Sequence, residues 1–274
     1  MKLIRSLMVL LVLMALVSMT VTVSVAAQDA ATMLDGYGYP ELSIDISEAG
    51  FVLPSAVPAG RTLITLHNTG TESRHAFLAR LPDDVTIGEL FAEQQEDMPP
   101  AWLWKSSFPG FPGETLPGES RQAVVDLSPG LYMILEDHVG VFVVQPGDAA
   151  TPSPVADPTS AATISLFEFG FELPQNLAAG DQVWTVHNVG RVPHELLLAK
   201  VPDGTTNDDL LDMFQNDTGE AVPVGGIGWL SPGATGWTEV VLVPGTYVAL
   251  CFVFDPDTGM PHAMEGMVQI FTIA

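Results

Sequence analysis

Short sequence patterns occur twice in this chain of 274 residues, always 120 positions apart. Three pairs of segments carry the match: residues 44–54 with 164–174, 66–70 with 186–190, and 81–83 with 201–203. A period of 120 residues is far too long for a solenoid repeat, and it is close to the size of one domain. The sequence therefore predicts two copies of one domain, at residues 41–146 and 163–274.

The segments outside the two copies have their own composition. Residues 147–162 are rich in Pro, Ala and Thr, which predicts an extended and semi-stiff linker. Residues 1–27 combine Lys2 and Arg5 with a long apolar run and small residues at its end. This pattern predicts a signal peptide, with retention as an N-terminal membrane anchor as the alternative. We expect the rest of the chain to be secreted, periplasmic or extracellular.

Each copy is predicted to consist mainly of short strands. Alternating or continuous apolar runs are found at residues 61–67, 123–127, 131–135 and 139–144, and again at 182–187, 239–243, 246–252 and 267–273. Pro129-Gly130 and Pro244-Gly245 supply tight turns at matching places. One short helix is expected in each copy, near residues 85–93 and 206–214. The predicted fold class is all-β, with two Greek-key sandwich domains in tandem.

The formal net charge of −24 limits the partners of the chain. Such acidity argues against binding to nucleic acid or to anionic lipid, because like charges repel. We expect contact with a membrane only through the possible N-terminal anchor.

The single cysteine, Cys251, lies in a run of soft donor groups. His262 and Met267 follow it on one loop, and His194 lies upstream. An isolated cysteine outside the cytoplasm forms an intermolecular disulfide, stays a free thiol or binds a metal, and a buried inert cysteine is the simplest reading. A thiolate, two imidazoles and a thioether are the ligands of a blue-copper centre. The sequence therefore predicts a metal site at His194, Cys251, His262 and Met267, with Met264 as the second candidate for the thioether.

Two segments resemble the cupredoxins, the blue (type 1) copper proteins. They are Asn188-Val-Gly-Arg-Val-Pro-His194 and the run Gly245-Thr-Tyr247, Cys251, Pro261-His262-Ala-Met-Glu-Gly-Met267-Val268. The resemblance covers the whole second copy, and the first copy through its similarity to the second. It implies a Greek-key barrel that holds copper through His194, Cys251, His262 and Met267. The ten residues between Cys251 and His262 exceed the plastocyanin spacing and are closer to the nitrite reductase type.

The first copy is predicted to lack this copper site. Glu136 stands where Cys251 would be, Val141 replaces Met267, and His75 is taken as the counterpart of His194, with one residue inserted before it. Without a thiolate a type 1 site is excluded. His75, Glu136 and His138 are candidate ligands for a harder metal such as zinc, and a metal-free scaffold or docking domain is the alternative.

Leu250 occupies the position where nitrite reductases and multicopper oxidases place a histidine beside the thiolate ligand. Six histidines are too few for a trinuclear copper site in addition to the predicted one. These features predict that the chain is not an enzyme.

The leading hypothesis is an exported mononuclear type 1 copper protein that carries electrons to or from an unidentified redox partner. One alternative is a protein that binds or delivers Cu(I) through Met260, Met264 and Met267 without redox cycling. Another is a metal-free interaction module at the cell surface.

Overall fold

The computed structural model describes residues 33–92, 100–147, 156–216 and 220–274. The predicted signal segment, residues 1–27, lies outside these ranges, as do residues 148–155 of the predicted linker. In the described part of the chain, no helix is both long and apolar enough to span a bilayer.

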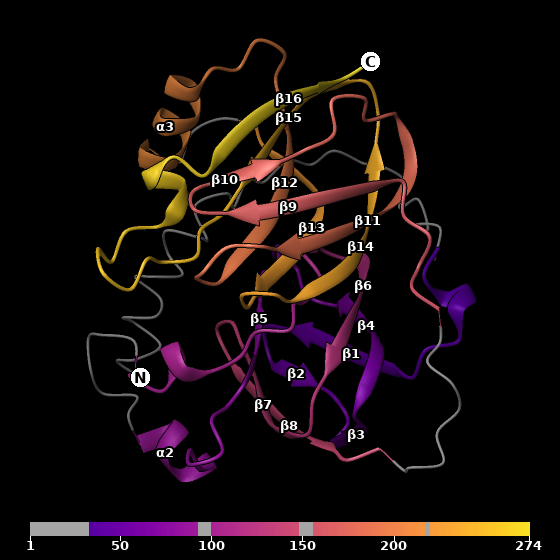
Figure 1. The fold of residues 1–274 in the computed structure, drawn as a ribbon, viewed down its shortest axis with the longest axis vertical. Helices are drawn as coiled ribbons and strands as arrows, with labels where there is room; N and C mark the ends of the chain where they lie inside the picture. The colour runs from indigo at the N-terminus through magenta and orange to yellow at the C-terminus, as the bar shows by residue number, and fades with distance from the viewer. Residues whose placement is uncertain (1–32, 93–99, 148–155, 217–219) are drawn as a thin grey trace.

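The first half of the chain forms two small sheets, drawn in indigo to magenta in Figure 1. One has the order β2-β1-β4-β6 and continues through β6 into a 12-stranded sheet shared with the second half; the other is the separate 4-stranded sheet β3-β8-β7-β5. The strands are β1 (Glu41–Ser47), β2 (Gly50–Val52), β3 (Ala56–Pro58), β4 (Gly60–Asn68), β5 (Phe77–Arg80), β6 (Ser120–Leu127), β7 (Gly130–Leu135) and β8 (Val139–Gln145). The short helices are η1 (Asp35–Tyr37), α2 (Ile87–Ala92) and η2 (Leu103–Lys105).

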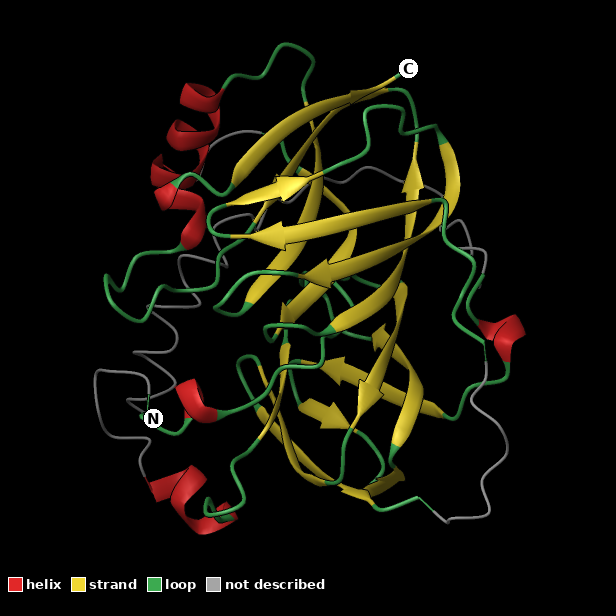
Figure 2. Ribbon diagram, in the orientation of Figure 1, coloured by secondary structure: helices red, strands yellow, loops and turns green. Residues whose placement is uncertain are grey.

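The second half, drawn from pink through orange to yellow, has a similar arrangement. Its strand orders are β10-β9-β11-β14 and β16-β15-β12-β13, joined by the single residue pair Gly225 and Val240. The elements are β9 (Ala162–Phe167), β10 (Gly170–Glu172), β11 (Gly180–Asn188), β12 (His194–Val201), α3 (Asn207–Asn216), β13 (Val222–Leu230), β14 (Thr235–Leu242), β15 (Gly245–Leu250), η3 (His262–Glu265) and β16 (Val268–Ile273). The prediction of an all-β sandwich fold with one short α-helix in each half is confirmed (Figure 2).

The strand registers of the two halves match. In the first half β1 runs parallel to β4, with Ile44 opposite Leu66. In the second half β9 runs parallel to β11, with Ile164 opposite Val186, which is the same pair shifted by 120 positions. The two parallel strand pairs therefore share one register, offset by 120 positions.

Turn chemistry explains where the paired strands begin. Gly130 and Gly245 open β7 and β15 with φ of 153° and 148°, which residues with a side chain rarely adopt. Two residues later, Tyr132 and Tyr247 each turn inward, and the hydroxyl donates back to the carbonyl of Ser128 at 3.0 Å and of Val243 at 2.7 Å. The two Pro-Gly turns are thereby fixed to the core.

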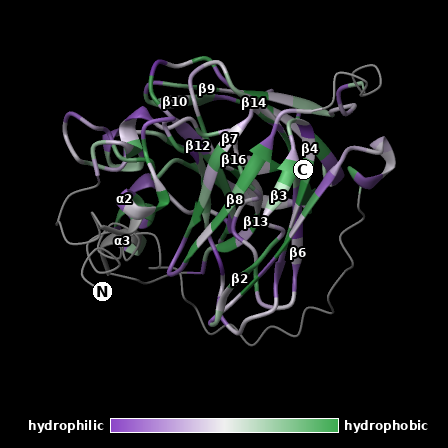
Figure 3. Cartoon of the chain, turned by 90° about the horizontal axis from the view of Figure 1, so that it is seen from below, coloured by the Kyte–Doolittle hydropathy of each residue, from purple (hydrophilic) through white to green (hydrophobic). Residues whose placement is uncertain are grey.

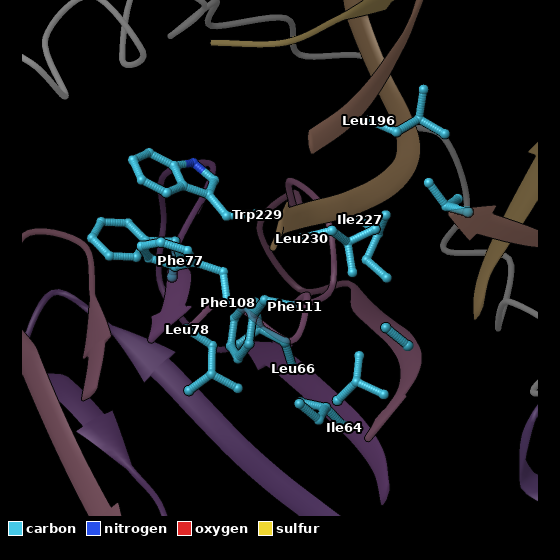
Figure 4. Packing of buried hydrophobic residues seen from close by; sticks show 14 of the residues in the cluster. Ile64, Leu66, Phe77, Leu78, Phe108, Phe111, Leu196, Ile227, Trp229 and Leu230 are labelled. Atoms are coloured by element: carbon cyan, nitrogen blue, oxygen red, sulfur yellow. The ribbon is translucent and has the colours of Figure 1, made fainter. Parts of the chain in front are cut away.

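A continuous hydrophobic core joins the two halves. β6 pairs with β14 across the boundary, at Val124–Trp237 and Ala123–Thr238. Figure 4 shows aromatic side chains from both halves in one cluster, where the Trp229 ring stacks on Phe77 at 4.9 Å and lies 4.9 Å from Phe108. Hydrophobic residues follow the strands in Figure 3, whereas hydrophilic residues concentrate in the connecting loops. The halves are therefore packed as closely as the layers of one domain.

Candidate metal centre

The four predicted ligands lie at the ends of neighbouring elements in the second half. His194 is the first residue of β12, and Cys251 directly follows β15. These two strands are antiparallel neighbours, with Leu197 opposite Leu250, so that the start of β12 meets the end of β15. His262 opens η3, and Met267 immediately precedes β16. All four side chains are fully buried.

Three donor atoms converge at this place. The Nδ1 atoms of His194 and His262 are 3.1 Å apart, and the Cys251 sulfur lies 3.4 Å from the His262 Nδ1. One nitrogen from each ring and the sulfur all lie within 4.8 Å of one another. Met267 is buried in the same hydrophobic cluster as Cys251.

Burial sets the protonation of these groups. It lowers the pKa of His194, and it lowers the pKa of His262 to about 4, with the neighbouring His194 acting in the same direction. Both rings are therefore neutral near pH 7, which is the form that binds a metal. Burial also raises the pKa of the Cys251 thiol well above its usual range, and the nearby Glu195 carboxyl adds to this. A metal that binds here displaces the thiol proton.

Surrounding groups hold the three side chains in place. The Glu195 backbone N–H points at the Cys251 sulfur with a separation of 3.4 Å. The Nε2 atom of His194 is 3.5 Å from a Glu168 carboxylate oxygen, so the nitrogen that faces away from the sulfur has an acidic neighbour. The Phe169 ring lies 4.8 Å from the His262 ring and covers it.

The long segment between Cys251 and His262 folds back on itself as a hairpin. The Ala263 N–H donates to the Cys251 carbonyl at 2.7 Å, and the His262 N–H donates to the Val253 carbonyl at 2.8 Å. The Asp255 N–H donates to the Met260 carbonyl at 2.9 Å, which closes the tip. The extra residues therefore project outward as a paired unit and return His262 to the sulfur.

In the first half an ion pair lies at the place that corresponds to the candidate centre. Arg74 Nη1 is 3.0 Å from a Glu136 carboxylate oxygen, and both side chains are buried. Arg74 also lies 3.2 Å from Glu48, just as His194 lies near Glu168, 120 positions further on. Arg74 is thus the counterpart of His194.

The predicted alignment of the first half was wrong by one residue. Asn68 and Asn188 make equivalent hydrogen bonds, to the carbonyls of Glu72 and Val192, which leaves no inserted residue in the turn before Arg74 and His194. The prediction matched His75 to His194 because both are histidines, whereas Arg74 occupies the corresponding position.

The candidate zinc ligands of the first half do not form a cluster. Glu136 pairs with Arg74, and His75 lies against Glu195 in the other half, with His75 Nε2 3.6 Å from Glu195 Oε2. Among the described residues the groups that bring three possible ligands together do not include His75, Glu136 and His138.

The contact between His75 and Glu195 joins the two halves beside the candidate centre, and no sequence pattern predicted it. The Phe252 N–H donates to Glu195 Oε1 at 2.8 Å, whereas Oε2 has no hydrogen-bond partner. Burial raises the pKa of Glu195 to about 8 and lowers that of His75 to about 4. Both groups are therefore mostly uncharged near neutral pH.

No protein-family model matches the chain, and no curated protein matches it in sequence. Among solved structures, a dithionite-reduced auracyanin from Roseiflexus castenholzii has 20% identity and a TM-score of 0.29, covering 41% of this chain and 94% of that one. A copper nitrite reductase from Nitrosomonas europaea has 14% identity and a TM-score of 0.24, covering 85% and 93%. A multi-copper oxidase from Pediococcus acidilactici has 12% identity and a TM-score of 0.24, covering 86% and 59%.

These comparisons contradict the prediction that the chain is not an enzyme. The nitrite reductase and the multi-copper oxidase are named as enzymes, and each is similar to most of this chain.

Proposed function

We propose that the chain is a cupredoxin-type copper protein with a single type 1 centre that transfers electrons. The observation that carries this proposal is the convergence of the His194 Nδ1, the His262 Nδ1 and the Cys251 sulfur in a fully buried place. One soft sulfur and two neutral imidazoles form the donor set that suits copper. Bound there, copper would accept and donate one electron.

The residues around the donors favour electron transfer in this proposal. His194, Cys251 and His262 are already within reach of one another, so a change of oxidation state requires little rearrangement. The Glu195 N–H hydrogen bond to the Cys251 sulfur withdraws electron density from the thiolate and stabilises it. The Phe169 ring packs on the His262 ring, and the apolar core contains Cys251, so this part of the site is shielded from water.

Met267 is proposed as the weak axial ligand. It is fully buried in the cluster that contains Cys251, whereas Met264 is 39% exposed. The buried thioether thus fits the role better than the exposed one.

Loading with Cu(II) and recording the absorption spectrum tests the proposal. We expect an intense visible band from charge transfer between sulfur and copper, and its loss in Cys251→Ser. Met267→Leu should shift the band and the reduction potential, whereas the matched variant Met264→Leu should leave both unchanged. A colourless protein whose Cys251 still reacts with thiol reagents after unfolding in the presence of Cu(II) would refute the proposal.

A second candidate function is the binding or delivery of Cu(I) without redox cycling. Met260 and Met264 lie two residues before and after His262 and are 44% and 39% exposed. Their thioethers are therefore accessible to a copper donor. This function predicts that Cys251→Ser retains Cu(I) binding and that Met260→Leu with Met264→Leu weakens it. The type 1 proposal predicts the reverse: Cys251→Ser weakens copper binding, and Met260→Leu with Met264→Leu leaves it unchanged.

Three further parts of the proposal concern the whole protein: residues 41–146 and 163–274 are duplicated domains, the chain is exported, and it exchanges electrons or copper with a partner protein. The matching strand registers support the duplication. The pattern of residues 1–27 supports export, and mass spectrometry of the mature N-terminus distinguishes cleavage from retention of that segment.

A further inference from the structure

Two buried polar atoms of the helix η3 have no hydrogen-bond partner. They are the Nε2 of His262 and the Oε2 of Glu265. The two residues are the first and last of the 3-10 helix η3, where side chains three positions apart lie above one another. Because buried polar atoms normally have partners, two orphaned atoms on one face of a short helix indicate a missing ligand.

Asp255 brings a third donor to the same place from the hairpin. One ligand atom each from Asp255, His262 and Glu265 lie within 4.8 Å of one another. In the described residues neither carboxylate forms an ion pair with a Lys or Arg side chain within 4 Å. The negative charge that gathers at this place is therefore left without a protein cation.

The hairpin holds both carboxylates in position. Asp255 Oδ1 accepts from the backbone N–H groups of Asp257 at 2.7 Å and Thr258 at 2.9 Å. The Thr258 hydroxyl donates to Glu265 Oε1 at 2.8 Å. The cluster is thus built from fixed side chains, and both carboxylates are partly exposed, which leaves a path for an ion from solvent.

We propose that Asp255, His262 and Glu265 form a second divalent-cation site, which shares the His262 ring with the Cys251 site. The Nδ1 of that ring faces Cys251 and His194, and its Nε2 is the nitrogen left for the second ion. One imidazole nitrogen and two carboxylates suit zinc or Cu(II), whereas the sulfur-containing set favours a softer ion. Where both nitrogens hold a metal, the ring releases its remaining proton to solvent.

Zinc binding by the full-length, metal-free protein tests the second site, with the stoichiometry measured by equilibrium dialysis. We expect two equivalents in the unaltered protein, one in the Cys251 site and one in the carboxylate site. Glu265→Gln and Asp255→Asn should each weaken the second equivalent by at least about tenfold and leave the first unchanged. Asp257→Asn, which changes an exposed acid of the same hairpin, is the matched control and should keep both equivalents.

Two results overturn the inference. One is a single zinc equivalent in the unaltered protein, and the other is unchanged binding in both Glu265→Gln and Asp255→Asn. The two variants check each other if one of them folds poorly, which far-UV circular dichroism reports. The visible copper band is measured separately, so a blue protein without the second zinc equivalent refutes this inference and leaves the proposed function standing. A colourless protein whose zinc binding depends on Glu265 refutes the proposed function and supports the second cation site.

Discussion

At the scale of single residues, burial decides which side chains of this protein carry charge. Near the candidate centre, the Cys251 thiol keeps its proton and both imidazoles are neutral, in each case because burial disfavours the charged form. The same cause leaves Glu195 protonated near neutral pH against an uncharged His75. The only ion pair buried on both sides in the described residues is Arg74 with Glu136, in the other half.

Glu195→Gln should remove a pH dependence of stability. The pKa of Glu195 is about 8 in the folded chain against 4.5 in the unfolded chain, so folding takes up a proton between these values. Stability is therefore lost as the pH rises from 4.5 to 8, by as much as ~4 kcal/mol between pH 5 and 8. The amide cannot titrate, and the loss should shrink by that amount. Urea unfolding of both metal-free proteins at pH 5 and 8 measures the difference, and equal slopes would refute the expectation.

Arg74→Ala should destabilise the first half strongly. The substitution leaves the Glu136 carboxylate buried without its partner, which typically costs about 3–5 kcal/mol. The matched control is Arg191→Ala, because Arg191 is 90% exposed and lies 3.8 Å from Glu168, so its loss should cost under ~1 kcal/mol. Arg74→Met combined with Glu136→Leu removes both charges and should recover most of the lost stability, as measured by denaturant unfolding. No recovery in the double variant would mean that the cost of Arg74→Ala comes from lost packing.

At the scale of elements, the loop between Cys251 and His262 forms a hairpin, and this pairing brings His262 close to Cys251 despite the length of the loop. Its inner hydrogen bonds join Cys251 to Ala263 and Val253 to His262, whereas the tip from Pro256 to Gly259 touches neither. The sequence showed the length of this loop, but the backbone pairing that returns His262 to the sulfur could not be predicted from it. That pairing depends on contacts across the loop, which residue types alone do not specify.

Replacing residues 256–259 with the two-residue turn Asn-Gly should leave copper binding at Cys251 unchanged. The shorter turn is the one that two-residue hairpins prefer, and the inner pairs stay in register. Ala263→Pro is the contrasting variant. It removes the N–H that donates a hydrogen bond to the Cys251 carbonyl, and it should lower copper affinity. Competition with a coloured chelator measures both affinities. If the shortened hairpin loses copper as Ala263→Pro does, the tip itself is needed.

At the scale of the whole molecule, the sequence predicted β4, β6, β7 and β8, their counterparts β11, β14, β15 and β16, and both α-helices, because these follow from apolar runs, Pro-Gly turns and capping groups. It did not predict the other eight strands of the described residues, or any contact between the halves. The pairing of β6 with β14 and the contact of His75 with Glu195 depend on how two similar surfaces meet. The wrong prediction that His75 is the counterpart of His194 has a related cause. Residue type favoured His75, whereas the fold places Arg74 at that position.

The shared core predicts that the two halves unfold together. Trp229 of the second half is 3% exposed and lies between Phe77 and Phe108 of the first, and the Phe108 N–H donates to the Ser231 hydroxyl at 2.8 Å. We expect one cooperative calorimetric transition for the unaltered, metal-free protein. Trp229→Ala opens a cavity at this boundary and should cost about 3–5 kcal/mol, which separates the transition into two. Phe271→Ala, at a partly buried residue within the second half, is the control: it should lower the second half's stability without uncoupling the halves. Two transitions in the unaltered protein would show instead that the boundary contributes little to stability and that each half folds on its own core.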